Sequence, residues 1–222
     1  MQADTAAVIT TYNRPWALAR SLPQVLALGC PVLVVDDGSE PAHEQDCERI
    51  RREHSCARLH WLRLPSNRGL PCARNIGLCY WLADPAMEWI SAFDDDVDVR
   101  PDLFARLRPV QDAVRRPLLT GRLAPEHPVV GEATIHGTRV LFHHSAAGTH
   151  FHAHRQYWLE VLPIPTPFLG APEHGRGSDS DWWVGSFSPN SIVKRGAKIA
   201  CVPGLVRTFA TTAQQSTCGN TG

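Results

Sequence analysis

Short apolar runs alternate with segments of helical spacing over the first hundred residues of the chain. The runs have the length of buried strands, and they predict strands at Ala6–Thr11, Val32–Val35, His60–Leu64 and Trp89–Phe93. Helices are predicted between them over residues 15–28, 43–57 and 71–82, the first of them capped by Asn13. Strands that alternate with helices form parallel sheets through crossover connections. The pattern therefore predicts an α/β fold with a mostly parallel central sheet flanked by helices.

The pattern changes in the second half of the chain. One helix is predicted over residues 102–115, and strands are predicted at Leu118–Leu123 and Thr138–His143. Residues 170–181 have the composition of an irregular loop that enters a helix at Trp182. The tail after Phe209 is polar and is expected to be flexible. We therefore divide the chain into residues 1–98, 99–209 and 210–222.

Three adjacent carboxylates, Asp94, Asp95 and Asp96, follow directly on the fourth predicted strand. Such a cluster is costly to desolvate because the charges repel one another, unless a cation lies nearby. Mn²⁺ and Mg²⁺ suit such a site, since they combine one or two carboxylates with phosphate oxygens and water. A solvated turn is the simpler explanation of an isolated Asp-Asp pair. The position at the carboxyl end of a parallel strand, where open α/β sheets bind ligands, favours the metal.

A second acidic pair, Asp36 and Asp37, follows the second predicted strand. A carboxylate there can accept the imino hydrogen of uracil, thymine or guanine, a hydrogen that cytosine lacks at N3. The sequence Asp37-Gly38 is also typical of an ordinary turn, and taken alone that explanation is the stronger one.

Arg74 and Asn75 lie near the beginning of the third predicted helix. The free N–H groups of a helix start favour phosphate, and an arginine adds a fork matched to phosphate oxygens. The alternative is a surface arginine on an amphipathic helix.

Composition and charge narrow the functional classes. The 222 residues carry 22 basic and 22 acidic side chains, so no net charge directs the chain toward nucleic acid. The longest apolar region, Leu22–Val35, is interrupted by prolines and is too short to span a membrane. The seven cysteines form no CxxC pair, which predicts reduced thiols and a cytoplasmic location.

Four motifs occur in the order and spacing of family 2 glycosyltransferases, and the first hundred residues resemble that family: Thr10–Pro15, Val34–Ser39, Asn67–Gly77 and Phe93–Asp96. The resemblance implies the GT-A fold, a DxD metal motif, a nucleotide-diphosphate sugar as donor and inversion at the anomeric carbon. Residues 1–98 would then form the nucleotide-sugar-binding half, and residues 99–209 the smaller acceptor-binding and catalytic half.

The resemblance also implies roles for single residues. The nucleotide would be bound by Thr11, Tyr12, Arg14, Asp37, Arg74, Asp94 and Asp95. Among these, Asp37 would hold the base, Arg74 would support the diphosphate and Asp94 would lie near the ribose. Asp96 would coordinate Mn²⁺ or Mg²⁺.

The catalytic residue is expected in the second half, where the resemblance is weaker. Gly170–Glu173 and Ser178–Asp181 resemble the family's segment ending in glycine and glutamate and its Glu-Asp-x-Asp motif. Asp179 would be the general base, with Asp181 as the alternative. Ser178 stands where glutamate is common, and Arg207 stands where many members place a histidine near the metal. These departures leave the register of the base and the metal dependence open.

His150, His152 and His154 alternate, so on a strand they would share one face. A three-histidine metal site is conceivable there. An exposed loop on the acceptor side is the preferred interpretation, because His143 and His144 nearby make the region polar.

These observations favour transfer of a sugar from a nucleotide diphosphate, most readily UDP, to the hydroxyl or similar nucleophile of an unidentified acceptor. A sugar nucleotidyltransferase is the first rival, but it needs a glycine-rich loop after the first strand, and Thr11–Trp16 contains no glycine. The second rival is a non-catalytic module that binds a sugar nucleotide or a glycan. Only turnover distinguishes that module from an enzyme.

Overall fold

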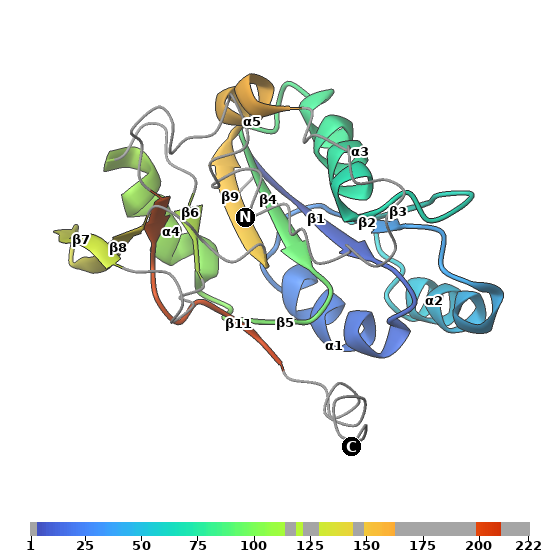
Figure 1. The fold of residues 1–222 in the computed structure, drawn as a ribbon. Coiled ribbons are helices and arrows are strands. Elements are labelled where there is room, and N and C mark those ends of the chain that lie inside the picture. Colours follow the sequence, from blue (N-terminus) through green and yellow to red (C-terminus); the bar gives the residue numbers. More distant parts are fainter. Residues whose placement is uncertain (1–3, 114–118, 122–128, 144–148, 163–198, 210–222) are drawn as a thin grey trace, which may run out of the picture.

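The α/β prediction is confirmed by a computed structural model, which describes residues 4–113, 119–121, 129–143, 149–162 and 199–209. Its larger sheet has nine strands in the order β3-β2-β1-β4-β9-β6-β10-β8-β7 (Figure 1). The first half of the chain supplies β1 (Thr5–Thr11), α1 (Pro15–Leu26), β2 (Val32–Asp36), α2 (Pro41–Glu53), β3 (Leu59–Arg63), α3 (Leu70–Leu82) and β4 (Trp89–Asp94). It is followed by β5 (Val97–Val99), α4 (Leu103–Ala113), β6 (Leu119–Thr120), β7 (Val129–Ile135), β8 (Thr138–His143), β9 (His150–His154), α5 (Arg155–Val161), β10 (Ile199–Cys201) and β11 (Val206–Thr208).

The first four strands form the parallel part of the sheet. β1 lies between β2 and β4 and runs parallel to both, while β3 pairs with β2 at the edge. Thr11 is in register with Asp36, and Thr10 is in register with Asp94. The residues that follow β1, β2 and β4 therefore meet at one edge of the sheet, as the sequence predicts.

The sheet continues into strands from the second half of the chain. β9 pairs antiparallel with β4, and β10 and β8 extend the sheet beyond it. Asp94 N donates a hydrogen bond to Thr149 O at 3.0 Å, so the chain entering β9 is bound to the end of β4. The division at residue 98 stays a prediction, since one sheet runs through both halves.

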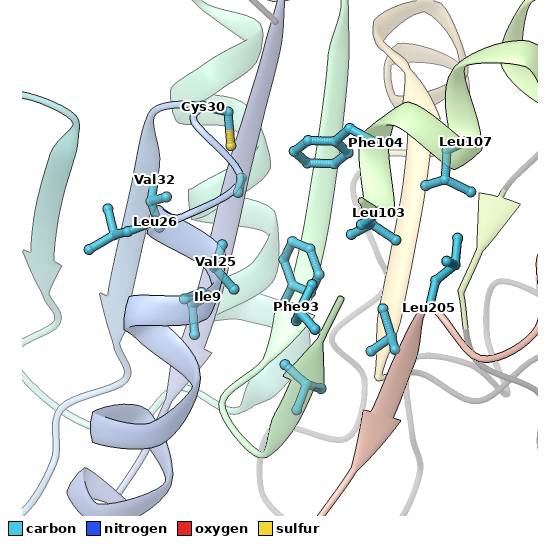
Figure 2. Packing of buried hydrophobic residues seen from close by; sticks show 14 of the residues in the cluster. Ile9, Val25, Leu26, Cys30, Val32, Phe93, Leu103, Phe104, Leu107 and Leu205 are labelled. Atoms are coloured by element: carbon cyan, nitrogen blue, oxygen red, sulfur yellow. The ribbon is translucent and has the colours of Figure 1, made fainter. Parts of the chain in front are cut away.

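Two apolar layers enclose the parallel strands. Ala7 and Ile9 of β1 face the layer that contains α1 and α4, whereas Ala6 and Val8 face the layer that contains α3 and α5. Figure 2 shows the first layer, in which Phe93 packs near Leu103 and Phe104. Every residue of β1 is buried, which explains why this strand is an uninterrupted apolar run rather than an alternating one.

The predicted helix cap at Asn13 is wrong. The residue before α1 is Arg14, and it makes no capping bond with its side chain. Asn13 has a φ of 55° and instead joins two loops. Its side-chain oxygen accepts a hydrogen bond from Glu40 N at 2.8 Å, and its own N–H donates to Ser39 Oγ at 3.0 Å. Asn13 therefore fixes the loop after β1 against the loop after β2.

The exposed histidine loop is also a wrong prediction. His150 and His152 lie fully buried on β9, beside β4. His152 Nδ1 is 2.7 Å from Ser91 Oγ, and its ring stacks on Trp89 with centroids 5.3 Å apart. His150 Nδ1 accepts a hydrogen bond from Gly121 N at 3.1 Å. Each ring thus has polar or aromatic partners in the core. Because of these partners, β9 is buried although its sequence is polar.

No three-histidine metal site is seen on this strand. His154 Nδ1 accepts from Gln156 N at 3.2 Å and caps α5. Within the described ranges, no group of three or more His, Cys, Asp or Glu side chains is placed to hold a metal ion.

None of the helices in the described part of the chain combines the length and the hydropathy that crossing a membrane requires. The six cysteines in this part form no disulfide.

Candidate functional site

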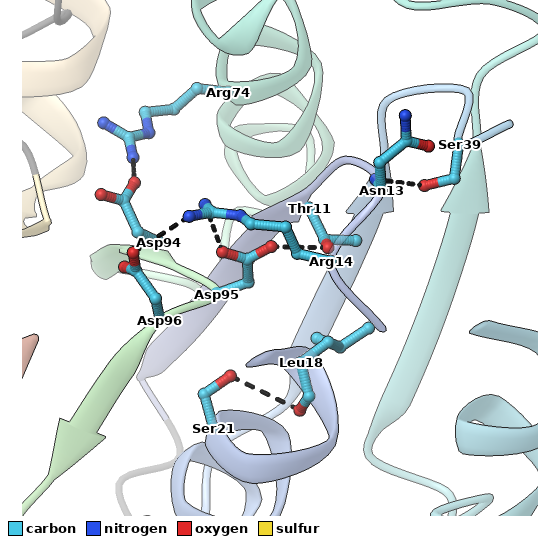
Figure 3. A network of polar contacts seen from close by, with 10 residues as sticks. All are labelled: Thr11, Asn13, Arg14, Leu18, Ser21, Ser39, Arg74, Asp94, Asp95 and Asp96. Carbon is cyan, nitrogen blue, oxygen red and sulfur yellow. Dashed lines mark hydrogen bonds and ion pairs between the residues drawn. The ribbon is translucent and has the colours of Figure 1, made fainter. Parts of the chain in front are cut away.

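The acidic triplet lies where β4 ends and turns into β5. Asp94 is the last residue of β4, and Asp95 and Asp96 form the turn. Figure 3 shows that the three side chains have different neighbours: Asp94 meets Arg74, while Asp95 and Asp96 both meet Arg14. Three carboxylates therefore share two guanidinium groups, which come from the loop before α1 and from α3. This arrangement reduces the repulsion expected from the sequence.

Arg74 is a buried residue, so the alternative of a surface arginine is excluded. Its side chain has no exposed surface, and Nη2 lies 2.5 Å from Asp94 Oδ1. Burial raises the pKa of Asp94, and the guanidinium opposes that effect. The ion pair joins the first turns of α3 to the carboxyl end of β4.

Gly77 explains how α3 approaches the sheet closely enough for this contact. A Cβ atom built on Gly77 would lie 2.4 Å from Val8 Cγ1 and 3.2 Å from Val35 Cγ2. The missing side chain lets the helix rest on β1 and β2, one turn beyond Arg74. The glycine of the Ala-Arg-Asn-x-Gly motif therefore acts through packing.

Asp95 is fully buried and connects β4 to β1. Thr11 Oγ1 donates a hydrogen bond to Asp95 Oδ2 at 2.7 Å, and Arg14 Nη2 forms an ion pair with Oδ1. Burial raises the pKa of Asp95 to about 7, against the lowering effects of Arg14 and of the threonine hydroxyl. Its two oxygens are directed at Thr11 and Arg14, so Asp95 positions the arginine.

Arg14 links the acidic turn to solvent. Its Nη1 lies 3.0 Å from Asp96 Oδ2, and 39% of its side chain is exposed. Burial lowers the pKa of Arg14, but the three nearby carboxylates outweigh this effect and raise it. Arg14 is therefore a permanent cation with a surface that a ligand can reach.

Asp96 has the oxygen best suited to a metal ion. Its side chain is 22% exposed, and Oδ1 has no hydrogen-bond partner among the described residues. An unpaired carboxylate oxygen beside a ligand edge fits Mn²⁺ or Mg²⁺, which need only one or two protein ligands when phosphate and water fill the other positions. The residues present therefore fit the predicted cofactor.

Asp37 lies at the neighbouring position on the same edge, after β2. Its N–H donates to Thr11 O at 2.9 Å, and its Oδ1 accepts from Arg68 N at 2.8 Å. Burial raises the pKa of Asp37, while the N–H groups of Arg68 and Gly69 lower it. The carboxylate thus holds the 66–69 loop against the end of β2.

Gly38 is required for that loop contact. Its φ is +69°, and a Cβ atom there would lie 2.4 Å from the carbonyl carbon of Ser66. The sequence Asp37-Gly38 is therefore more than a simple turn. Tyr12, on the other side of the loop, is half-buried, and its hydroxyl lies 3.4 Å from Glu40 Oε1 at the surface.

The sequence comparison decides the family. The model of glycosyl transferase family 2 matches residues 6–116, which is half of the 222-residue chain. The chain belongs to glycosyltransferase family 2. No curated protein matches the sequence.

Several solved glycosyltransferase structures resemble this family 2 chain. GalNAc-T7, crystallised with UDP, GalNAc and Mn²⁺, matches with a TM-score of 0.60 and 17% identity over 94% of this chain and 44% of its own. TarS from S. aureus matches with a TM-score of 0.45 and 22% identity over 59% of this chain and 24% of its own. The mannosyltransferase PcManGT from Pyrobaculum calidifontis, with GDP-Man and Mn²⁺, has a TM-score of 0.45 and 17% identity over 55% of this chain and 36% of its own. GalNAc-T7 supports the GT-A fold, and this chain spans less than half the length of each of these proteins.

In this family 2 chain, the last described strand, β11, lies next to the acidic turn. β11 pairs antiparallel with β5, so that Arg207 lies opposite Asp98. Phe209 N donates to Asp96 O at 3.1 Å. Arg207 is exposed and stands near the turn, as its sequence position implies, although it is in register with Asp98 rather than with Asp96.

The expected general base lies outside the described residues. Asp179, its alternative Asp181, and the Gly170–Glu173 and Ser178–Asp181 motifs all fall within residues 163–198, so their assignment stays a prediction. The sequence reasoning missed the bridge that Arg14 forms between Asp95 and Asp96. The order of the motifs carries no signal for this bridge, because it depends on how the side chains meet at the edge of the sheet.

Proposed function

We propose that this chain transfers a glycosyl group from a nucleotide-diphosphate sugar to a nucleophilic acceptor, with inversion at the anomeric carbon. The observation that carries the proposal is the group of carboxylates at the end of β4, paired with Arg14 and Arg74 at the ligand-binding edge of a GT-A sheet. Family membership supports sugar transfer in general. Asp96 and Arg14 combine a carboxylate oxygen that has no hydrogen-bond partner among the described residues with a partly exposed cation, which suits a diphosphate and its counterion.

The nucleotide would lie between the loops that follow β1 and β2. Asp37 would accept the imino hydrogen of the base, which restricts the donor to uracil, thymine or guanine nucleotides. Asp94, held by Arg74, would face the ribose. UDP is our first choice because of the family resemblance, and the crystal structure of GalNAc-T7 contains UDP.

Arg14 is the better placed of the two arginines for the diphosphate. Arg74 has no exposed surface and is bound to Asp94, so we assign it the positioning of that carboxylate. The guanidinium of Arg14 is partly exposed and can offset the charge that grows on the departing nucleotide diphosphate. A Mn²⁺ or Mg²⁺ ion held by Asp96 would supply further charge neutralisation at the same point.

Asp179 would remove the proton from the acceptor hydroxyl as it attacks the anomeric carbon, with Asp181 as the alternative. Loss of such a base typically reduces the rate about 10²- to 10⁴-fold. Asp179→Asn should then abolish most turnover and leave donor binding nearly unchanged. If Asp181→Asn has that effect instead, the register of the assignment is shifted by two residues. A cytoplasmic location is part of the proposal.

Donor binding is tested by thermal shift with UDP, GDP and CDP, each with and without Mn²⁺. We expect stabilisation by UDP or GDP that depends on Mn²⁺, and none by CDP. Asp96→Asn should remove the Mn²⁺ dependence, whereas Asp102→Asn, an exposed acid paired with Arg100, serves as the matched control. No stabilisation by any nucleotide in the presence of Mn²⁺ would overturn the proposal.

Hydrolysis of the donors that bind is the second measurement. Slow release of free sugar in the absence of acceptor is expected of a transferase. Binding without any release, in wild type and with added acceptors, would identify a non-catalytic module.

A further inference from the structure

An aromatic pair lies beside the acidic turn and is not used by the proposed reaction. Trp16, in the first turn of α1, is 49% exposed, although the other tryptophans in the described part are largely buried or half-buried. Its ring meets that of Phe209 edge to face, with centroids 6.2 Å apart. We call these two residues the Trp16–Phe209 ledge.

A second contact, with Arg20, fixes the ring of Phe209. The guanidinium carbon of Arg20 lies 4.1 Å from the centre of the Phe209 ring, a cation–π distance. Arg20 is itself fixed by two hydrogen bonds to Asp98, of 2.9 Å and 2.5 Å. The position of Phe209 is therefore determined by contacts from α1 and β5.

Trp16, Arg20 and Gln24 follow one another at four-residue intervals on one face of α1. Gln24 accepts a hydrogen bond from Val99 N at 2.8 Å and donates to Asp98 Oδ1 at 3.1 Å. This face of the helix therefore lies along β5, and Figure 1 shows α1 beside that strand. Trp16 is the member of the row that contacts Phe209 with its ring.

The ledge is continuous with the donor site at two points. Phe209 N donates to Asp96 O, on the residue assigned to the metal. Trp16 follows Arg14 by two residues, and Arg14 binds Asp95 and Asp96. A ligand resting on the ledge would thus lie next to the reacting end of the donor rather than next to the base at Asp37.

We propose that the Trp16–Phe209 ledge is a carbohydrate subsite, which holds a pyranose ring of the acceptor beside the donor sugar. The flat C–H face of a pyranose is apolar and slightly positive, and it suits the electron-rich face of an aromatic ring. The nearest basic group, Arg20, is already neutralised by Asp98, so the ledge favours an uncharged sugar over an anion. The inference rests on the proposed function, because it takes the acidic turn as the donor site.

Pure packing does not explain this arrangement. An indole with half of its surface in water gives up part of the stabilisation that burial would bring. Leu159 on α5 is 54% exposed as well, but it lies away from the acidic turn and makes a suitable control.

The experiment measures saturation transfer by NMR from the full-length chain to four disaccharides: cellobiose, lactose, maltose and N,N′-diacetylchitobiose. Wild type should transfer saturation to at least one of the disaccharides, and most strongly to the C–H protons on one face of a ring. Trp16→Ala should weaken that binding by about tenfold or more, and Trp16→Tyr should restore much of it. Leu159→Ala should bind like wild type. All variants should remain folded in a thermal unfolding measurement, because about half of each side chain is exposed.

The outcomes separate this inference from the proposed function. If none of the disaccharides is saturated, or if Trp16→Ala binds them as wild type does, the ledge is not a carbohydrate subsite. Binding of a proline-rich peptide in place of the sugars, lost in Trp16→Ala, would likewise overturn the inference. If the disaccharides bind through Trp16 while no nucleotide diphosphate binds with Mn²⁺, the proposed function fails and the ledge belongs to a glycan-binding module.

Discussion

The hydroxyl of Thr11 donates a hydrogen bond of 2.7 Å to the buried carboxylate of Asp95. The bond joins the last residue of β1 to the turn after β4, two strands that lie side by side in the sheet. Asp95 in turn holds the guanidinium of Arg14. The accessible cation of the site is therefore positioned through a threonine in the core.

Thr11→Val keeps the shape of the side chain and removes the donor. We expect the free energy of unfolding to fall by about 1–3 kcal/mol, because a buried carboxyl oxygen loses its hydrogen-bond donor. Urea denaturation measures the change. Thr134→Val on the exposed strand β7 is the control and should change stability by less than about 0.5 kcal/mol. Equal effects of the two substitutions would contradict the role of the bond.

Asp95 should make stability depend on pH in an unusual direction. Its pKa is about 7 in the folded chain, against 3.8 for an unperturbed aspartate, so the folded state binds more protons between these values. Its contribution should therefore be most favourable near pH 4 and should decline as the pH rises to about 7. The difference in unfolding free energy between wild type and Asp95→Asn, measured across this range, should follow that course. A flat difference would show that the acid is ionised throughout.

His152 should act in the opposite direction. Burial lowers its pKa to about 3 from the 6.5 of an unperturbed histidine, so the unfolded state binds more protons between these values. Stability from His152 is complete above about pH 6.5 and is lost as the pH falls. The loss on acidification from pH 6.5 to 4.5 should be smaller in His152→Gln than in wild type. His136, exposed in the turn between β7 and β8, supplies the control substitution His136→Gln.

Gly77→Ala tests the contact between α3 and the sheet. The added methyl group would meet Val8, and we expect a destabilisation of about 1–3 kcal/mol from overpacking. Val8→Ala removes the atom that it meets. The double variant should therefore be more stable than the sum of the single changes predicts, and calorimetry would reveal this coupling. If the destabilisations of the two single variants simply added, the contact with Val8 would not be the source of the strain.

Arg74→Met leaves the partly buried Asp94 without its cation. Breaking such a pair typically costs about 3–5 kcal/mol, whereas replacing both partners by apolar residues is often neutral. Arg74→Met/Asp94→Leu should therefore recover most of the stability lost in the single variant. It should not recover nucleotide binding, because the carboxylate assigned to the ribose is gone. If the double variant recovered both stability and nucleotide binding, the assignment of Asp94 to the nucleotide site would be wrong.

The first half of the fold was predictable because burial on both faces leaves a clear mark on the sequence. β1 and β2 each contain four consecutive apolar residues, and β4 is apolar except for Ser91 and its last residue, Asp94. The ends of all three strands carry the motifs. The start of α2 was missed by two residues because Pro41, rather than His43, takes the first helical position. The relation between the motifs followed from topology, since parallel strands end at one edge.

β9 was not predictable in the same way. Its sequence, His-Phe-His-Ala-His, looks polar, and its burial depends on partners distant in the chain, such as Ser91 and Trp89. The bridge from Arg14 to Asp95 depends on side-chain geometry that motif order does not contain. The sequence places Trp16 at the start of a helix but does not predict its exposure, which follows from the way α1 lies along β5.

The hydrogen bond from Phe209 N to Asp96 O ties the turn after β4 to a segment made much later in synthesis. A nascent chain that has emerged only as far as α4 has all of its nucleotide motifs, but the backbone behind its acidic turn has not yet been made. The capacity to bind a charged donor should therefore arise late, after β11 has been translated and has docked on β5.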